Sequence, residues 1–199
     1  MRAVAELAAL LIGDPPAIWR DLGFVLDGDA CHVSGVRHAL SGSGRGILDW
    51  GLRGIDAAEI DGLKVGMAPF PAEPTPEHPN GVVALDHLVV VTPDIGRTIT
   101  ALEGVGVECR RTRDAGRGIH QAFFKLGEVI LELGGPATPA GDGAPTLFGL
   151  AYTVADLDVT AAFLGDRLRP TKDAVQPGRH IATLDRGAGS SVAIAFMSA

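Results

Sequence analysis

The chain has 199 residues, of which 46% are hydrophobic and only 5% aromatic, and it carries a formal net charge of -7. That length is enough for one large domain or two small ones with a substantial core. The acidic charge argues against nucleic-acid binding, which calls for a basic face, so no nucleic-acid partner is expected. The two cysteines, Cys31 and Cys109, form no CxxC pair, which indicates reduced thiols and a cytoplasmic protein.

The N-terminal segment MRAVAELAALLIGDPP superficially resembles a secretory signal peptide. Its apolar run contains Glu6, ends at Asp14 and is shorter than a membrane span. Residues 3–13 are therefore predicted to form a core strand, and no membrane partner is expected.

Residues 1–57 are predicted to form one βαβββ unit. Asp14 has a side chain suited to cap a helix, and that helix is expected to end at Gly23. Three strands are expected after the helix, because turn-forming residues stand at 27–29 and 42–46.

A linker is predicted at residues 58–80. This stretch is rich in proline and shows no apolar periodicity, which is typical of an extended segment. His78 is accordingly expected to be a solvated linker residue.

The pattern of strand, helix and three strands then occurs twice more. Asp94 and Asp156, which lie 62 residues apart, each precede an apolar helical stripe and are predicted to cap those helices. The two copies occupy residues 81–136 and 146–199, and such self-similarity is the signature of a repeat architecture. The chain is therefore predicted to contain three βαβββ units, an α+β arrangement.

Two short motifs carry a resemblance to a known family. LDHLVVVTPD on the first strand of the second unit and VILELGG on its last strand resemble the vicinal oxygen chelate superfamily. This superfamily includes glyoxalase I, bleomycin-resistance proteins and extradiol dioxygenases. The resemblance implies that two βαβββ units, residues 81–199, pair into a cup-shaped mixed sheet, with the N-terminal unit as a third.

The resemblance also implies positions for metal ligands. In metal-dependent members each paired unit gives one ligand from its first strand and a glutamate from its last. His87 and Glu132 match these positions in the second unit, whereas Gly149 and Ala195 stand at the equivalent positions of the third unit and cannot ligate. A divalent metal ion is therefore expected only at a degenerate site.

His87 and Glu132 also allow a reading without metal. Strand alternation places both side chains on the cup side, where Glu132 could accept a hydrogen bond from His87. Such a pair suits acid–base catalysis or the binding of a polar substrate, and a purely structural pair remains an alternative.

Other residues are candidates for the lining of the cup. Phe123 and Phe124 are neighbours, so one of them must face the cup, and Phe124 is chosen as the stacking residue. Trp50 is expected to form a wall of the pocket, and His120 and His180 are expected to reach in from neighbouring strands. An arginine cluster could admit an anionic substrate or could belong to a solvated edge strand: Arg110, Arg111, Arg113 and Arg117.

Two functions are therefore predicted for the cup. The first is an enzyme or enzyme-like protein that acts on a small organic molecule by isomerisation, lyase chemistry or, with a metal, oxygen insertion. The alternative is a metal-free protein that sequesters a ligand. Because three units leave one without a partner and its apolar face exposed, a homodimer that pairs the first units is also expected.

Overall fold

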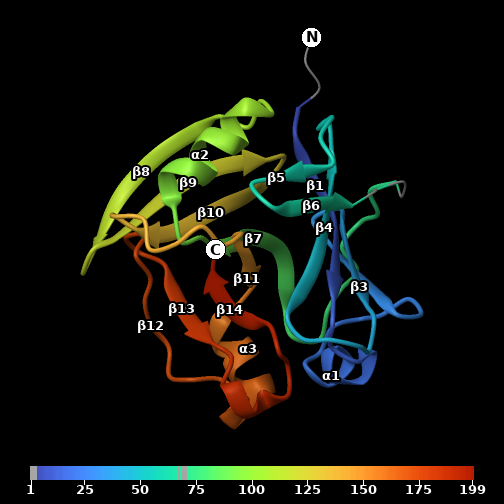
Figure 1. Ribbon diagram of the computed structural model, residues 1–199. Coiled ribbons are helices and arrows are strands. Elements are labelled where there is room, and N and C mark those ends of the chain that lie inside the picture. Colours follow the sequence, from blue (N-terminus) through green and yellow to red (C-terminus); the bar gives the residue numbers. More distant parts are fainter. Residues whose placement is uncertain (1–3, 67, 69–70) are drawn as a thin grey trace.

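The computed structural model describes residues 4–66, 68 and 71–199, and its strands form two mixed sheets (Figure 1). The six-stranded N-terminal sheet has the order β2-β3-β1-β4-β6-β5, and the eight-stranded C-terminal sheet has the order β12-β13-β14-β11-β7-β10-β9-β8. Parts of the predicted first unit and linker, residues 1–3, 67, 69 and 70, lie outside the described residues. In the described part of the chain, no helix combines the length and apolar character that a membrane span needs.

The N-terminal elements follow the predicted order of strand, helix and three strands. They are β1 (Glu6–Ile12), α1 (Pro16–Asp21), β2 (Ala30–Val33), β3 (Val36–Leu40) and β4 (Ile47–Arg53), with β5 (Glu59–Ile60) and β6 (Leu63–Gly66) added. Their pairing differs from that of the later units, because β1 lies between β3, which is parallel to it, and β4, which is antiparallel.

The predicted linker is partly structured. β5 and β6 form a small antiparallel pair, and β6 runs parallel to β4 at the sheet edge. His78 is buried rather than solvated, since its Nδ1 accepts a hydrogen bond from Val25 N at 3.0 Å and its Nε2 lies 3.3 Å from His32 O. The prediction of a solvated linker is therefore wrong for these residues.

The C-terminal sheet consists of two βαβββ units with one strand order. The second unit contains β7 (Val82–Val91), α2 (Ile95–Gly104), β8 (Cys109–Gly116), β9 (Ile119–Leu126) and β10 (Val129–Pro136). The third contains β11 (Thr146–Val154), α3 (Leu157–Leu164), β12 (Lys172–Asp173), β13 (His180–Thr183) and β14 (Ala193–Ser198). Asp94 and Asp156 cap α2 and α3 as predicted, by accepting hydrogen bonds from backbone N–H groups of the first helical turn.

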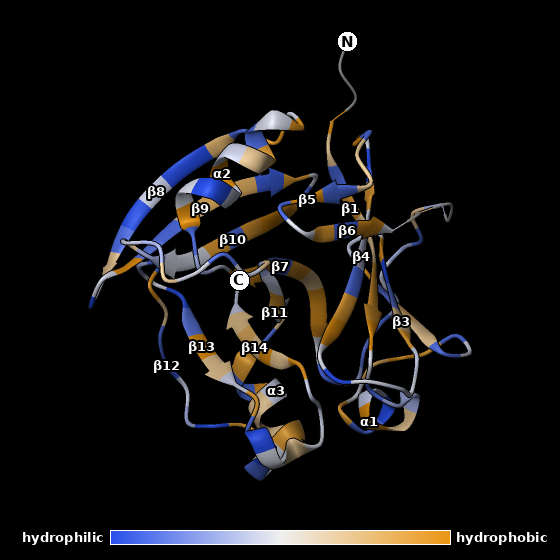
Figure 2. Ribbon diagram, in the orientation of Figure 1, coloured by the Kyte–Doolittle hydropathy of each residue, from blue (hydrophilic) through white to orange (hydrophobic). Residues whose placement is uncertain are grey.

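The two sheets share one apolar core. Figure 2 shows hydrophobic residues along β1, β4 and β7, where the sheets approach each other. Trp19 and Phe24 pack together, and Phe24 also lies 5.3 Å from Tyr152 of the C-terminal sheet, measured between ring centroids. Trp50 is 2% exposed and belongs to this core, so the expected role of Trp50 as a pocket wall is not supported by its position. The apolar face that motivated the homodimer is covered within the chain, and the homodimer stays a prediction.

Asp14 does not cap α1. The N-cap position is occupied by Pro15, which offers no side-chain acceptor. The buried carboxylate of Asp14 instead accepts hydrogen bonds from the Trp19 indole at 3.0 Å, Ser190 Oγ at 2.7 Å and Ser191 N at 2.9 Å. It thereby ties the start of the chain to the loop before the last strand.

His38 sits fully buried in the shared core. Its Nδ1 lies 3.1 Å from Val36 O, while its Nε2 has no hydrogen-bond partner among the described residues. Burial lowers the pKa of His38 from 6.5 to about 4. The folded protein therefore holds this imidazole neutral at a pH where the unfolded chain binds a proton.

Stability is expected to fall between pH 6.5 and pH 4 because of His38. In this window the unfolded chain binds more protons, so the free energy of unfolding decreases by up to about 1.4 kcal/mol per pH unit as the pH is lowered. Urea unfolding of the wild type and of His38→Leu across this range measures the slope. The variant should show a shallower slope, and equal slopes would contradict the assignment.

Candidate functional site

A cavity of about 810 Å³ opens on the side of the eight-stranded sheet that faces away from the shared core. Its floor and walls come from β7, β10, β9 and β8 on one side and from β11, β13, β14 and the segment after β12 on the other. His87 and Glu132 both line it. The volume lies in the range of small-molecule sites.

A β-bulge places Asp86 next to His87. In the antiparallel pair of β7 and β11, Ala151 pairs with His87 and the next pair is Tyr152 with Leu85, so Asp86 is an extra residue. A bulge re-aims a side chain that would otherwise alternate to the opposite face. The His87 Nδ1 consequently lies 2.6 Å from Asp86 Oδ1, and both side chains are largely buried.

The Asp86 carboxylate is held from its other side as well. Its Oδ2 accepts hydrogen bonds from Arg179 Nη2 at 2.8 Å and from Thr153 Oγ1 at 2.9 Å. Burial alone would raise the pKa of Asp86, but hydrogen bonds from His87 and Arg179 outweigh it and hold the pKa well below its ordinary value. An ionised Asp86 therefore accepts a hydrogen bond from His87 Nδ1, which leaves Nε2 as the ring nitrogen that can take up a proton.

Glu132 belongs to a separate polar chain on the same face. Its Oε1 accepts a hydrogen bond from Gln121 Nε2, and Gln121 Oε1 in turn accepts from Arg113 Nε at 3.0 Å. The hydrogen bond predicted between His87 and Glu132 is not formed, because Asp86 occupies the Nδ1 side of the histidine. The two groups lie on adjacent strands, with Glu132 in register with Val89, two residues beyond His87.

The register of the third unit repeats that of the second. Ile130 pairs with His87 and Glu132 pairs with Val89, and the third unit shows the same stagger, with Ala193 opposite Gly149 and Ala195 opposite Ala151. In each unit the first strand lies parallel to the last, and the units meet through the antiparallel first strands β7 and β11 around the cavity. Residues 82–198 have the vicinal oxygen chelate fold.

Comparison with known proteins gives weak likenesses. No protein-family model matches the chain, and no curated protein matches it. Methylmalonyl-CoA epimerase from Mycobacterium tuberculosis is 18% identical, with 59% of this chain and 89% of the other covered and a TM-score of 0.48. A hypothetical protein from Bacillus halodurans is 16% identical, with 58% and 93% covered and a TM-score of 0.48. A variant of methylmalonyl-CoA epimerase from Streptomyces coelicolor, in complex with 2-nitronate-propionyl-CoA, is 20% identical, with 59% and 98% covered and a TM-score of 0.48.

The vicinal oxygen chelate cup of this chain does not fit a four-ligand metal site. His87 and Glu132 supply two donors, while Gly149 and Ala195 supply none. A Cβ atom built on Gly149 would lie 2.6 Å from Ala193 O, so the backbone leaves no room for a ligand side chain there. Among the described residues, no group of three or more His, Cys, Asp or Glu side chains is placed to hold a metal ion. Two protein ligands bind a divalent ion weakly.

Some of the remaining residues that were predicted to line the cup do so, and others lie outside the cavity. Phe123 is in register with Glu132 and faces the cup, whereas Phe124 pairs with Leu131, is 1% exposed and packs in the core. Both Phe123 and Phe124 line the cavity, so the role of Phe124 as the stacking residue stays a prediction. His120 and His180 are exposed and do not line the cavity, and His180 lies 3.5 Å from Asp173 instead.

Three polar residues of the site were missed from the sequence. Strict alternation would place Asp86 on the face opposite His87, because it does not allow for a bulge. The available signal was two consecutive polar residues, Asp86 and His87, inside an otherwise apolar strand. Arg179 carries no local signal, since Asp86 lies 93 positions away, and Gln121 meets Arg113 and Glu132 only through the pairing of neighbouring strands.

Proposed function

We propose that the cup binds a small organic molecule and that His87 transfers a proton at the bound substrate without the help of a metal ion. The observation that carries this proposal is the buried pair of Asp86 and His87, whose Oδ1 and Nδ1 atoms lie 2.6 Å apart and of which His87 lines the cavity. A histidine held by a carboxylate at Nδ1 presents a basic Nε2, which is the arrangement that general-base catalysis needs.

The residues of the cup divide the work of such a reaction. His87 Nε2 removes a proton from an acidic C–H bond, and Asp86 stabilises the imidazolium that forms. Glu132, on the same face and one strand away, is a second group that can accept or return a proton. Removal and return of a proton supports an isomerisation, and removal followed by loss of a leaving group supports a lyase reaction.

Solvent deuterium exchange tests this function without knowledge of the natural substrate. The protein is incubated in deuterium oxide with a panel of carbonyl compounds that carry acidic Cα–H bonds, such as 2-oxo acids and malonyl-type thioesters, and exchange is followed by proton NMR. The wild type is expected to exchange at least one member of the panel. His87→Ala should slow that exchange by about 10²–10⁴-fold, the usual contribution of a general base.

His120→Ala is the matched control, because this exposed histidine lies outside the cavity lining. Its exchange rate should equal that of the wild type. Equal exchange by wild type and His87→Ala would rule out His87 as the base.

A second candidate is sequestration of a flat ligand without reaction. The guanidinium of Arg111 lies 5.6 Å from the centroid of the Phe123 ring, and both residues line the cavity. A flat ligand can stack against such a platform. Tight binding of a ligand whose deuterium content never changes would favour this function over proton transfer.

A further inference from the structure

The two walls of the cup differ in charge. The wall built by β8 and β9 carries the cations Arg111, Arg113 and Lys125, all of which line the cavity. Cross-strand pairing puts Arg111 opposite Phe123, and Lys125 opposite Ile130, on the cup side. Figure 2 shows β8 as mainly hydrophilic along its length.

These cations are not neutralised by the protein. Of the basic residues on this wall, Arg110 alone has an ion pair, with Glu108 at 3.0 Å. Among the described residues, no carboxylate oxygen lies within 4.0 Å of a basic nitrogen of Arg111, Arg113 or Lys125. In a chain with a net charge of -7, unpaired cations gathered in a cavity create a local field that attracts anions.

The opposite wall is mainly apolar, with Asp173 and Gln176 as its polar members. Its lining side chains from the third unit include Ile181, Met197, Ala151 and Val175. Val175 is 73% exposed although it is aliphatic, and it stands at the rim of the cavity. A hydrocarbon group placed against this wall would remove apolar surface from water on both sides.

We propose that the ligand of the cup is an amphiphilic organic anion, with its acidic group at Arg111 and Lys125 and its hydrocarbon body against the wall of the third unit. This inference rests on the proposed function for the identity of the site, and it adds the class and orientation of the substrate. In that orientation the middle of the ligand lies over the floor, where His87 and Glu132 stand between the two walls.

A matched pair of fluorescent probes tests the proposal. The amphiphilic anion 8-anilinonaphthalene-1-sulfonate is titrated against the protein, and N-phenyl-1-naphthylamine, which lacks the sulfonate, is titrated in parallel. The anion is expected to bind about tenfold or more tightly than its neutral analogue, because charge attraction adds to apolar burial. Raising the NaCl concentration from about 0.1 M to about 1 M should weaken binding of the anionic probe and leave binding of the neutral probe unchanged, because the Debye length shrinks from about 10 Å to about 3 Å.

Two double variants locate the charge. Arg111→Gln with Lys125→Gln should weaken binding of the sulfonate by about tenfold or more and leave the neutral probe unchanged. The control, Lys64→Gln with Arg186→Gln, removes the same net charge from exposed positions outside the cavity and should change neither affinity. Near-ultraviolet circular dichroism of each variant confirms that probe binding does not report partial unfolding.

The outcomes separate this proposal from the proposed function. Equal affinity for the two probes, or sulfonate binding that the Arg111 and Lys125 changes leave intact, would overturn the amphiphilic anion. His120→Gln, at an exposed position outside the cavity lining, should retain sulfonate binding. If the sulfonate binds through its charge but no compound exchanges deuterium, the ligand class is supported and the proton-transfer function fails. If neutral and anionic compounds exchange at equal rates, the proton-transfer function is supported and the amphiphilic anion is overturned.

Discussion

Replacing Asp86 with asparagine is expected to slow deuterium exchange at neutral pH by on the order of 10³-fold. The substitution preserves shape, so the loss would come from the hydrogen-bond pattern. Arg179 and Thr153 both donate to one carboxylate oxygen, which forces the amide oxygen of an asparagine toward them. The amide NH₂ group then faces the Nδ1 of His87 and stabilises the tautomer whose Nε2 carries the proton, so the base is lost.

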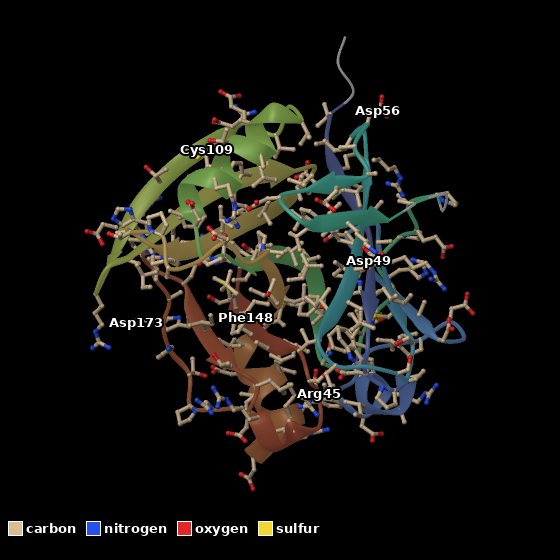
Figure 3. All side chains as sticks on the ribbon, in the orientation of Figure 1. Arg45, Asp49, Asp56, Cys109, Phe148 and Asp173 are labelled. Atoms are coloured by element: carbon tan, nitrogen blue, oxygen red, sulfur yellow. The ribbon has the colours of Figure 1, made fainter. Side chains whose placement is uncertain are left out.

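Nitrogen-15 NMR of the His87 ring checks the tautomer directly, and exchange kinetics check its consequence. In the wild type the proton should reside on Nδ1, and in Asp86→Asn on Nε2. Asp56→Asn is the control, because Asp56 is exposed on the N-terminal part of the molecule (Figure 3) and lies outside the cavity lining. An unchanged tautomer together with an unchanged rate would show that Asp86 does not orient His87.

Replacing Asp14 with alanine is expected to lower the free energy of unfolding by about 3–5 kcal/mol. The carboxylate is 3% exposed and accepts hydrogen bonds from Trp19, Ser190 and Ser191. Its removal leaves a buried indole N–H and a backbone N–H without acceptors. It also releases Ser191, whose hydroxyl accepts a hydrogen bond from Gly46 N at 2.6 Å.

Chemical denaturation at neutral pH measures the loss, and Asp56→Ala, at an exposed position, should stay within about 0.5 kcal/mol of the wild type. Burial alone would raise the pKa of Asp14. The hydrogen bonds from Ser191, Ser190 and Trp19 lower the pKa by more than burial raises it, so the pKa lies below the ordinary value of 3.8. A depressed carboxyl pKa contributes stability above pH 3.8 that is lost as the pH falls through the folded-state pKa. A loss as small as that of the control would mean that water replaces the carboxylate without cost.

Sequence periodicity was sufficient to predict the helices and strands of the second and third units. The caps at Asp94 and Asp156, the apolar strands and the repeat predicted the βαβββ units, because each depends on residues close in sequence, and the resemblance to the vicinal oxygen chelate superfamily implied their pairing into a cup. Alternation also placed His87 and Glu132 on the cup side, where both line the cavity. Whether they act as catalytic residues stays a prediction.

The predictions that were wrong share one physical cause, which is contact between residues far apart in the sequence. The strand order of the N-terminal unit depends on which edge of β1 meets β3 and which meets β4, and element order alone does not determine this. The burial of His78 depends on a hydrogen bond from Val25, 53 positions earlier. The domain boundaries at residues 57 and 81 likewise remain predictions.

The bulge at Asp86 has a counterpart in the third unit. Between the pairs Leu147 with Val90 and Gly149 with Val89, Phe148 is an extra residue, and it lies 62 positions after Asp86, the spacing of the repeat. The backbone irregularity is thus present in both units, but at these positions only the second unit carries ionisable side chains, Asp86 and His87, where the third has Phe148 and Gly149. A planar intermediate in the cup would therefore present a single prochiral face to His87. Return of the proton to that face would give one enantiomer of the product.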